Sequence, residues 1–388
     1  MLYALLLGIG FSSSLALRSL DPLTVSIAGD LAVAPETAAL LGTALSIPYA
    51  LSNPLLGPTG DHFGKGRLIT ICLWLITISV FVSAFAPTFF VLAILRAVTG
   101  MSAGGIVPLG QAMIGDMFKA SERQIAIARS TAVIFLGQLA GASLAGIADA
   151  WIGWRGVLIA CACVTGTAAL AATWKMPPPP PRRSAAFSPR TIVQSYLVIL
   201  RMPRAWVCYA NCYVQAGIMF GLMPFISLIL ERLQLGGARE AGFVIAGFSA
   251  GSLLFVLSIR LTVRMLSRPA LLVAGAIVGT AGLLFASTGP AWYWLVAIFA
   301  GSGFGYFLQH NAIQGAVADL SEHYRASAYS MHASMFFLGT ATAPIAYRFA
   351  ISNFGVHATL TGAALVFLCV GLATSALFSR FQRQEMRA

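Results

Sequence analysis

The chain reads GPTGDHFGKGRLITICLWLITISVFVSAF from Gly57 to Phe85, a charged turn followed by a long uncharged segment. Residues 68–85 carry no charge, and residues 271–307 form a second, longer uncharged run. An apolar run of about 18 residues is long enough to cross the hydrocarbon core of a bilayer as a helix. The stretch therefore predicts that a membrane-spanning helix follows the turn at 57–67.

The composition of the whole chain gives the same result. Of its 388 residues, 58% are hydrophobic and only 9% are charged, whereas soluble domains carry about 25% charged residues. Twelve helices are predicted, at 3–28, 37–59, 67–86, 88–112, 125–150, 153–174, 205–230, 239–264, 268–287, 291–314, 325–350 and 355–379. We therefore expect an all-α polytopic membrane protein with an N-terminal six-helix bundle (1–174), a Pro/Arg-rich linker (175–204) and a C-terminal six-helix bundle (205–388).

The distribution of positive charge predicts the orientation. With a cytoplasmic N-terminus, 18 of the 24 Lys and Arg residues fall in inner connections and only four in outer ones. Basic residues concentrate in cytoplasmic loops, so both termini and the linker are expected in the cytoplasm. This placement accounts for the net charge of +12, and no nucleic-acid partner is expected.

An internal repeat relates the two halves of the sequence. Three landmarks recur at nearly one offset: Asp116 and Asp319 (203 residues), Arg123 and Arg325 (202), and Gly137 and Gly339 (202). Repeated halves are a transporter architecture in which the substrate site lies near the middle of the membrane.

The turn that opens the quoted stretch carries a family signature. Its glycine, acidic, aromatic and basic residues resemble the loop between helices 2 and 3 of the major facilitator superfamily; the matching residues are Gly57, Asp61, Phe63, Gly64, Lys65 and Arg67. The resemblance implies a cytoplasmic latch between the halves, to which we also assign Asp116 and Arg123. The alternative is an ordinary solvated turn.

Two further helices are similar to the family pattern. Arg96 followed by Gly100 and Gly104 resembles its fourth helix, and Trp154-Arg155 precedes the sixth. The fifth contains Gly137, Gly141 and Gly146, similar to a glycine-rich antiporter motif, although the usual Gly-Pro step reads Gly141-Ala142. Glycines at this spacing are also typical of helix packing faces.

Three ionisable residues fall inside predicted spans: Arg18 and Asp21 in the first helix and Arg96 in the fourth. A charge at mid-bilayer costs about 2.5–3.5 kcal/mol on insertion scales, so such groups are expected to pair and to face a cavity. We interpret Asp21 as the titrating carboxylate, with Arg18 and Arg96 tuning its protonation and binding a polar or anionic substrate. A fixed structural ion pair is the alternative.

The second half offers neutral polar candidates. Asn211 and Gln215 share one face of the seventh helix, and Tyr306, Gln309 and His310 lie in the tenth. Polar groups in a span must find partners, which are either a substrate or neighbouring helices. The sequence shows no phosphate-binding loop, zinc-protease pair or metal cluster, so no cofactor or metal is expected.

The sequence thus predicts a secondary active transporter that moves a small organic solute by alternating access. The resemblance to the family implies proton-coupled export as the leading mode. Proton-driven uptake of a small polar or anionic metabolite is an alternative, favoured by the two intramembrane arginines. Outside transport, the alternatives are a non-transporting receptor and an intramembrane enzyme using Ser249. We expect a monomer in the inner membrane of a bacterium, with protons and a small-molecule substrate as partners.

Overall fold

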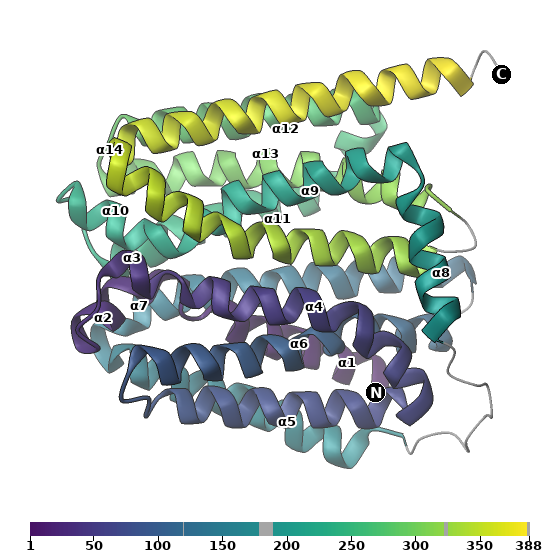
Figure 1. Ribbon diagram of the computed structural model, residues 1–388, viewed down its shortest axis with the longest axis horizontal. Coiled ribbons are helices and arrows are strands. Elements are labelled where there is room, and N and C mark those ends of the chain that lie inside the picture. Colours follow the sequence, from purple (N-terminus) through teal and green to yellow (C-terminus); the bar gives the residue numbers. More distant parts are fainter. Residues whose placement is uncertain (119, 178–188, 322–324, 386–388) are drawn as a thin grey trace. The chain divides into compact units, whose positions relative to one another are not determined.

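A computed structural model describes residues 1–118, 120–177, 189–321 and 325–385, and in these ranges every regular element is a helix (Figure 1). The helices of the first part are α1 (Leu2–Arg18), η1 (Asp21–Leu23), α2 (Thr24–Asp30), α3 (Pro35–Ala38), α4 (Leu41–Phe63), α5 (Lys65–Ser83), α6 (Phe89–Met117) and α7 (Ala120–Lys175). Those that follow are α8 (Pro189–Leu200), α9 (Pro203–Leu222), η2 (Met223–Phe225), α10 (Ile226–Arg232), α11 (Ala238–Met265), α12 (Arg268–Ser287), α13 (Trp292–Ala318) and α14 (Arg325–Glu385).

The chain forms two compact units: residues 1–192 with 237–242, and residues 193–236 with 243–388. In the first unit α1 packs against α7, α4 packs against α6, and α5 packs against both α6 and α7. In the second unit α9 packs against α14, and α12 packs against α13 and α14. The predicted domain boundaries at 174 and 204 stay predictions.

The helices are long and apolar enough to cross a membrane. Within the described residues nine stretches qualify by length and composition. Two of these stretches, 129–175 and 327–381, each contain a non-helical glycine and therefore two limbs. Helix α13 is not among these nine stretches, but its 27 residues are long enough to cross as well. Nine stretches, two extra limbs and α13 agree with the twelve predicted spans.

Gly153 and Gly355 divide the two longest helices. Their φ angles are +64° and +79°, with ψ near 170°, a conformation that is essentially restricted to glycine. The 56 residues of α7 would extend about 84 Å as one straight helix, far more than a bilayer core of about 30 Å. The chain therefore has to break, and Figure 1 shows α14 as two limbs that meet at a bend.

The first predicted span of each unit is interrupted, which corrects the continuous helices predicted at 3–28 and 205–230. Between α1 and α2 lies the short 3₁₀ helix η1, which contains Pro22, and between α9 and α10 lies η2, which contains Pro224. Proline has no N–H group and cannot continue the α-helical bonding pattern. The two prolines are 202 residues apart, so the interruption is part of the repeat.

The linker contains a helix that the sequence reading did not predict. Helix α8 begins at Pro189, buries Ile199, and its Tyr196 hydroxyl donates to Ser330 Oγ at 3.2 Å. The linker from Val193 onward is therefore packed within the second unit.

Candidate transport site

Arg18 and Asp21 lie at the interruption of the first helix. Arg18 is the last residue of α1 and Asp21 is the first residue of η1. Arg18 Nη1 lies 3.5 Å from Asp21 Oδ2, and the two side chains are only 5% and 3% exposed. The i,i+3 spacing thus places a buried ion pair directly at the break.

Arg96, the eighth residue of α6, closes the end of α1. Its Nη2 donates to the Leu17 carbonyl at 2.6 Å and its Nη1 donates to the Ala16 carbonyl at 3.3 Å. The last carbonyls of a helix have no partner within the helix, and a cation near this end is favoured by the helix dipole. The break in α1 therefore creates the acceptors that hold the buried Arg96 side chain.

The three side chains form one electrostatic group, which we call the charge cluster: Arg18, Asp21 and Arg96. Asp21 interacts with both guanidinium groups, so the cluster carries a net charge of +1 when Asp21 is ionised. Tyr49 of α4 interacts with Arg18, and Cys161 of α7 interacts with Arg96. Both come from distant parts of the sequence, and no spacing pattern indicates them.

The predicted gate residues lie at the opposite end of α6 and around the turn between α4 and α5. Gly64 adopts φ +93° at this turn, and Lys65 Nζ lies 2.7 Å from Asp116 Oδ2. Gly57 lies in α4, and Arg67 is exposed on α5. The side chains of Asp61 and Arg123 fall outside the part that the structure describes.

The glycines of the fifth predicted helix mark close contacts between helices. A Cβ atom on Gly137 would overlap the backbone carbonyl of Phe11, and one on Gly141 would overlap that of Leu15. Gly146 lies against the short segment 237–242, which groups with the first unit. These contacts support the helix-packing alternative for this motif.

A second polar group lies where α2 meets α7 in the first unit. Asp30 pairs with Arg155 and accepts a hydrogen bond from Trp154 Nε1 at 3.1 Å. Ser26 donates to the Asp149 carboxylate. Only Trp154 and Arg155 stood out in the sequence. Their contacts show that this dipeptide holds α2 against α7.

The polar candidates of the second unit lie in two different settings. Asn211 Nδ2 donates to Thr374 Oγ1 at 2.9 Å, which joins α9 to α14. The Gln309 side chain lies against Gly371 and Gly275 of the neighbouring helices. Gln215 is 1% exposed, and neither atom of its amide has a hydrogen-bond partner among the described residues. The Gln309 amide is equally buried and also has no hydrogen-bond partner among the described residues, so both glutamines retain the features of a ligand-binding group.

Tyr306 and His310 form a separate aromatic group. The Tyr306 hydroxyl lies 3.2 Å from His310 Nδ1, and the two rings stack with centroids 5.3 Å apart. The structure adds Cys212 and His332, whose donor atoms lie close to those of His310. No metal cluster was expected from the sequence, because positions 212, 310 and 332 do not form a known spacing of metal ligands.

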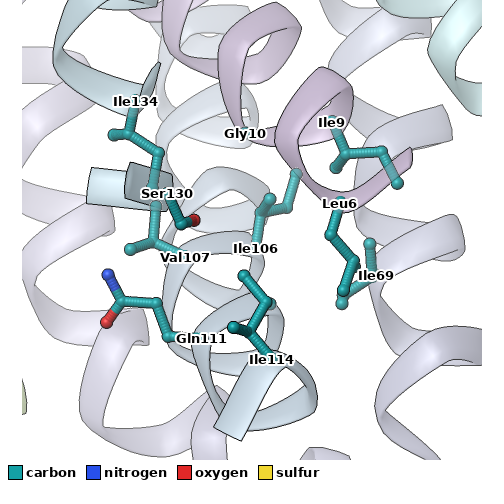
Figure 2. A pocket seen from close by; sticks show the side chains of 11 residues that line it. Leu6, Ile9, Gly10, Ile69, Ile106, Val107, Gln111, Ile114, Ser130 and Ile134 are labelled. Carbon is teal, nitrogen blue, oxygen red and sulfur yellow. The ribbon is translucent and has the colours of Figure 1, made fainter. Parts of the chain in front are cut away.

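A hollow in the first unit is bordered by α1, α5, α6 and α7 (Figure 2). Aliphatic side chains form most of its wall, with Gln111 and Ser130 as polar groups; the lining residues are Leu6, Ile9, Gly10, Ile69, Ile106, Val107, Gly110, Gln111, Ile114, Ser130 and Ile134. None of the charge cluster lines it.

Known transporters are similar to this chain. The Vacuolar basic amino acid transporter 2 of Saccharomyces cerevisiae is 29% identical over 113 residues, which are 29% of this chain and 24% of that protein. The Multidrug export protein EmrB of Haemophilus influenzae is 27% identical over 129 residues, 33% of this chain and 25% of that protein. The matched region thus spans about a quarter of the length of these two relatives.

Two similarities extend over most of the chain. The Uncharacterized MFS-type transporter YybF of Bacillus subtilis is 21% identical over 343 residues, 85% of this chain and 82% of that protein. The crystal structure of a bacterial homologue of the human lysosomal transporter Spinster, inward-facing and occupied, has a TM-score of 0.72 at 17% identity. It covers 97% of this chain and 96% of its own. The second similarity shows the fold.

The family comparison covers nearly all of the sequence. A family model described as Major Facilitator Superfamily matches residues 6–344. The match includes the signature turn, the charge cluster and the second unit as far as the first limb of α14. The chain therefore belongs to the Major Facilitator Superfamily, and it is a membrane transporter and not an enzyme.

Proposed function

We propose that this transporter exports small organic compounds in exchange for protons, and that Asp21 carries the proton. The charge cluster supports this role because it places one carboxylate between two guanidinium groups in the membrane-spanning part of the first unit. The transporter works as a monomer in a bacterial inner membrane with both termini cytoplasmic, an orientation supported by the 18-to-4 distribution of basic residues.

One comparison within the chain carries the proposal. The second unit interrupts α9 with Met223-Pro224-Phe225, as the first unit interrupts α1 with Asp21-Pro22-Leu23. At the 202-residue offset, Phe220 stands where the first unit has Arg18. The second unit thus builds a similar interruption without charge, so a break of this kind does not by itself require charged residues. Because each buried charge costs about 2.5–3.5 kcal/mol, a role in transport explains its presence.

The geometry suggests how protonation acts on the helix. An ionised Asp21 attracts Arg18 across the break between α1 and η1. Protonation removes this attraction and raises the net charge of the cluster from +1 to +2. Arg96 remains attached to the last carbonyls of α1, so the change is felt where the helix is already interrupted and bends most easily.

Two observations favour export of an apolar or amphipathic compound. Local relatives include a Multidrug export protein and a Quinolone resistance protein, NorA of Staphylococcus aureus, which is 29% identical over 117 residues and matched over 30% of its length. The hollow shown in Figure 2 has a mainly aliphatic wall; in this structure it has room for a water-sized molecule only, and an apolar compound would need it to open.

Transport by purified protein in liposomes tests the proposal. With a quinolone and a hydrophobic dye as probes, we expect an imposed proton gradient to drive transport by the wild type and not by Asp21→Asn. Exchange of labelled compound without a gradient is expected to persist in the variant. Asp149→Asn is the matched control, because it changes another carboxylate of the same unit. Gradient-driven transport by Asp21→Asn at the wild-type rate would refute the coupling role.

Proton-driven uptake of an anionic metabolite is the second candidate. Arg96 Nε has no hydrogen-bond partner among the described residues, and the cluster is net positive, so it offers a donor to a carboxylate or phosphate group. A panel of labelled carboxylates in the same liposomes separates the two functions. Accumulation in the direction of proton movement indicates uptake, and movement against it indicates export.

A further inference from the structure

Three metal-binding side chains meet inside the second unit. Cys212 of α9, His310 of α13 and His332 of α14 each offer one ligand atom, and these atoms lie within 4.8 Å of one another. Cys212 Sγ lies 3.7 Å from His332 Nε2, and the two imidazole centroids are 5.3 Å apart. Ligand atoms that are bonded to one metal at about 2.0–2.3 Å lie only slightly closer together than these three donor atoms.

The three residues lie at one depth within their helices. Cys212 is nine residues after the start of α9, His332 is seven after the start of α14, and His310 is eight before the end of α13. At 1.5 Å per residue each lies about 10–14 Å from the corresponding helix end. The helices thus present their donors in one layer, inside the membrane-spanning part of the unit.

The surroundings resemble the second layer of a metal site. The Tyr306 hydroxyl lies 3.2 Å from His310 Nδ1, which leaves Nε2 of that ring to face the group, and a hydrogen bond to the remote nitrogen is the usual way to orient a ligating histidine. Phe307 and Phe336 pack around His310. His332 is 4% exposed and directs Nε2 toward Cys212, while its remote Nδ1 has no hydrogen-bond partner in the described residues, so the orienting hydrogen bond is present at His310 alone.

We propose that Cys212, His310 and His332 bind one Cu(I) ion. Binding forms an Sγ–Cu bond, breaks the thiol S–H bond and releases one proton, so the thiolate and Cu(I) together are neutral. Zn(II) would leave a charge of +1 at a depth where a charge is costly, and no carboxylate belongs to the group among the described residues. Soft thiolate ligands also favour Cu(I).

Anaerobic titration of the full-length reduced protein with Cu(I), in competition with a chromophoric chelator, tests the site. We expect one Cu(I) per chain and one proton released per ion. Cys212→Ser and His332→Gln are each expected to weaken binding by at least about tenfold. Cys208→Ser, which changes a buried cysteine one turn earlier on α9, is the matched control and is expected to bind as the wild type does.

Thermal unfolding gives an independent measurement, since an ion that binds the folded state raises its stability. The midpoint is expected to rise with Cu(I) in the wild type and in Cys208→Ser, and to stay constant in Cys212→Ser. Equal binding by Cys212→Ser and the wild type would overturn the site. Tighter, proton-releasing binding of Zn(II) with the same dependence on Cys212 would overturn the choice of metal.

Discussion

Arg268 Nη2 lies 2.7 Å from Asp319 Oδ2, and this contact repeats the 2.7 Å pair of Lys65 and Asp116 in the first unit. In both pairs the acid follows the base by 51 residues. Each base begins a helix (α5 or α12), and each acid lies at the end of the next (α6 or α13). The helix dipole disfavours a cation at the start of a helix and an anion at its end. Each pair therefore offsets two unfavourable placements.

Neutralising these acids is expected to affect transport more than stability. Asp116→Asn and Asp319→Asn each remove a partly exposed pair, which contributes only about 0–1 kcal/mol, and each also relieves the unfavourable charge at a helix end. If a pair is closed in one transport state and open in another, the loss of about 1 kcal/mol of its attraction shifts the equilibrium between the two states about fivefold. Thermal unfolding and liposome transport measure the two effects.

The exchanged pair is the control for this prediction. In Lys65→Asp/Asp116→Lys the attraction is restored with the charges reversed, so transport is expected to recover above that of Asp116→Asn. Wild-type transport by both single variants would show that neither pair takes part in the cycle.

Alanine substitutions at Gly153 and Gly355 test whether glycine is needed at the breaks in α7 and α14. A Cβ atom at either position would meet no other atom within 4 Å, so any effect of alanine comes from the positive φ alone. We expect Gly153→Ala and Gly355→Ala each to lose about 1–3 kcal/mol, measured as a lower unfolding midpoint. Gly362→Ala is the control, because Gly362 lies in a helical limb of α14 with open space around it. An equal decrease in all three variants would contradict this explanation.

The sequence predicted the helices well where apolar runs end at polar residues. The predicted range 268–287 coincides with α12, because Arg268 and the segment after Ser287 interrupt the hydrophobic pattern. The breaks at Pro22 and Pro224 were missed because the apolar run continues across both prolines. The hydrophobic pattern indicates which residues lie within the lipid, but it does not indicate the local backbone conformation. Alignment of the two halves at the 202-residue offset would have found both prolines.

The candidate site was predictable only where its residues are rare or close in sequence. Arg18 and Asp21 stand out as charges in an apolar helix, and their spacing alone predicts their contact. Cys212 and His332 are 120 residues apart, and only the packing of α9 against α14 brings them together. The same packing pairs Asn211 with Thr374, a partner that no local pattern indicates.

Arg96→Lys tests the link between α6 and the end of α1. The guanidinium group donates to two carbonyls from two different nitrogens, and a lysine ammonium is a compact charge that does not reproduce this planar geometry. We expect the variant to keep the buried charge and to lose about 1–3 kcal/mol of stability. Gradient-driven transport is expected to fall more strongly than labelled-compound exchange. A variant with wild-type stability and transport would show that Arg96 acts only as a charge.

Gly110 allows the hollow of Figure 2 to be filled without disturbing the helices that form it. Gly110 lines the hollow on α6, and a Cβ atom there would meet nothing within 4 Å. Gly110→Ala is therefore expected to fold normally, with a gain of up to about 1 kcal/mol because alanine favours the helix. Gly110→Phe places a ring larger than the hollow against its wall and is expected to transport more slowly, because it obstructs the space into which an apolar substrate would enter. Gly100→Ala is the contrasting variant, since its Cβ would overlap the Leu45 backbone and destabilise the unit by about 1–3 kcal/mol.

If Gly110→Phe were stable and transported both probes at the wild-type rate, the hollow would lie outside the substrate path, and recognition would have to depend on the charge cluster.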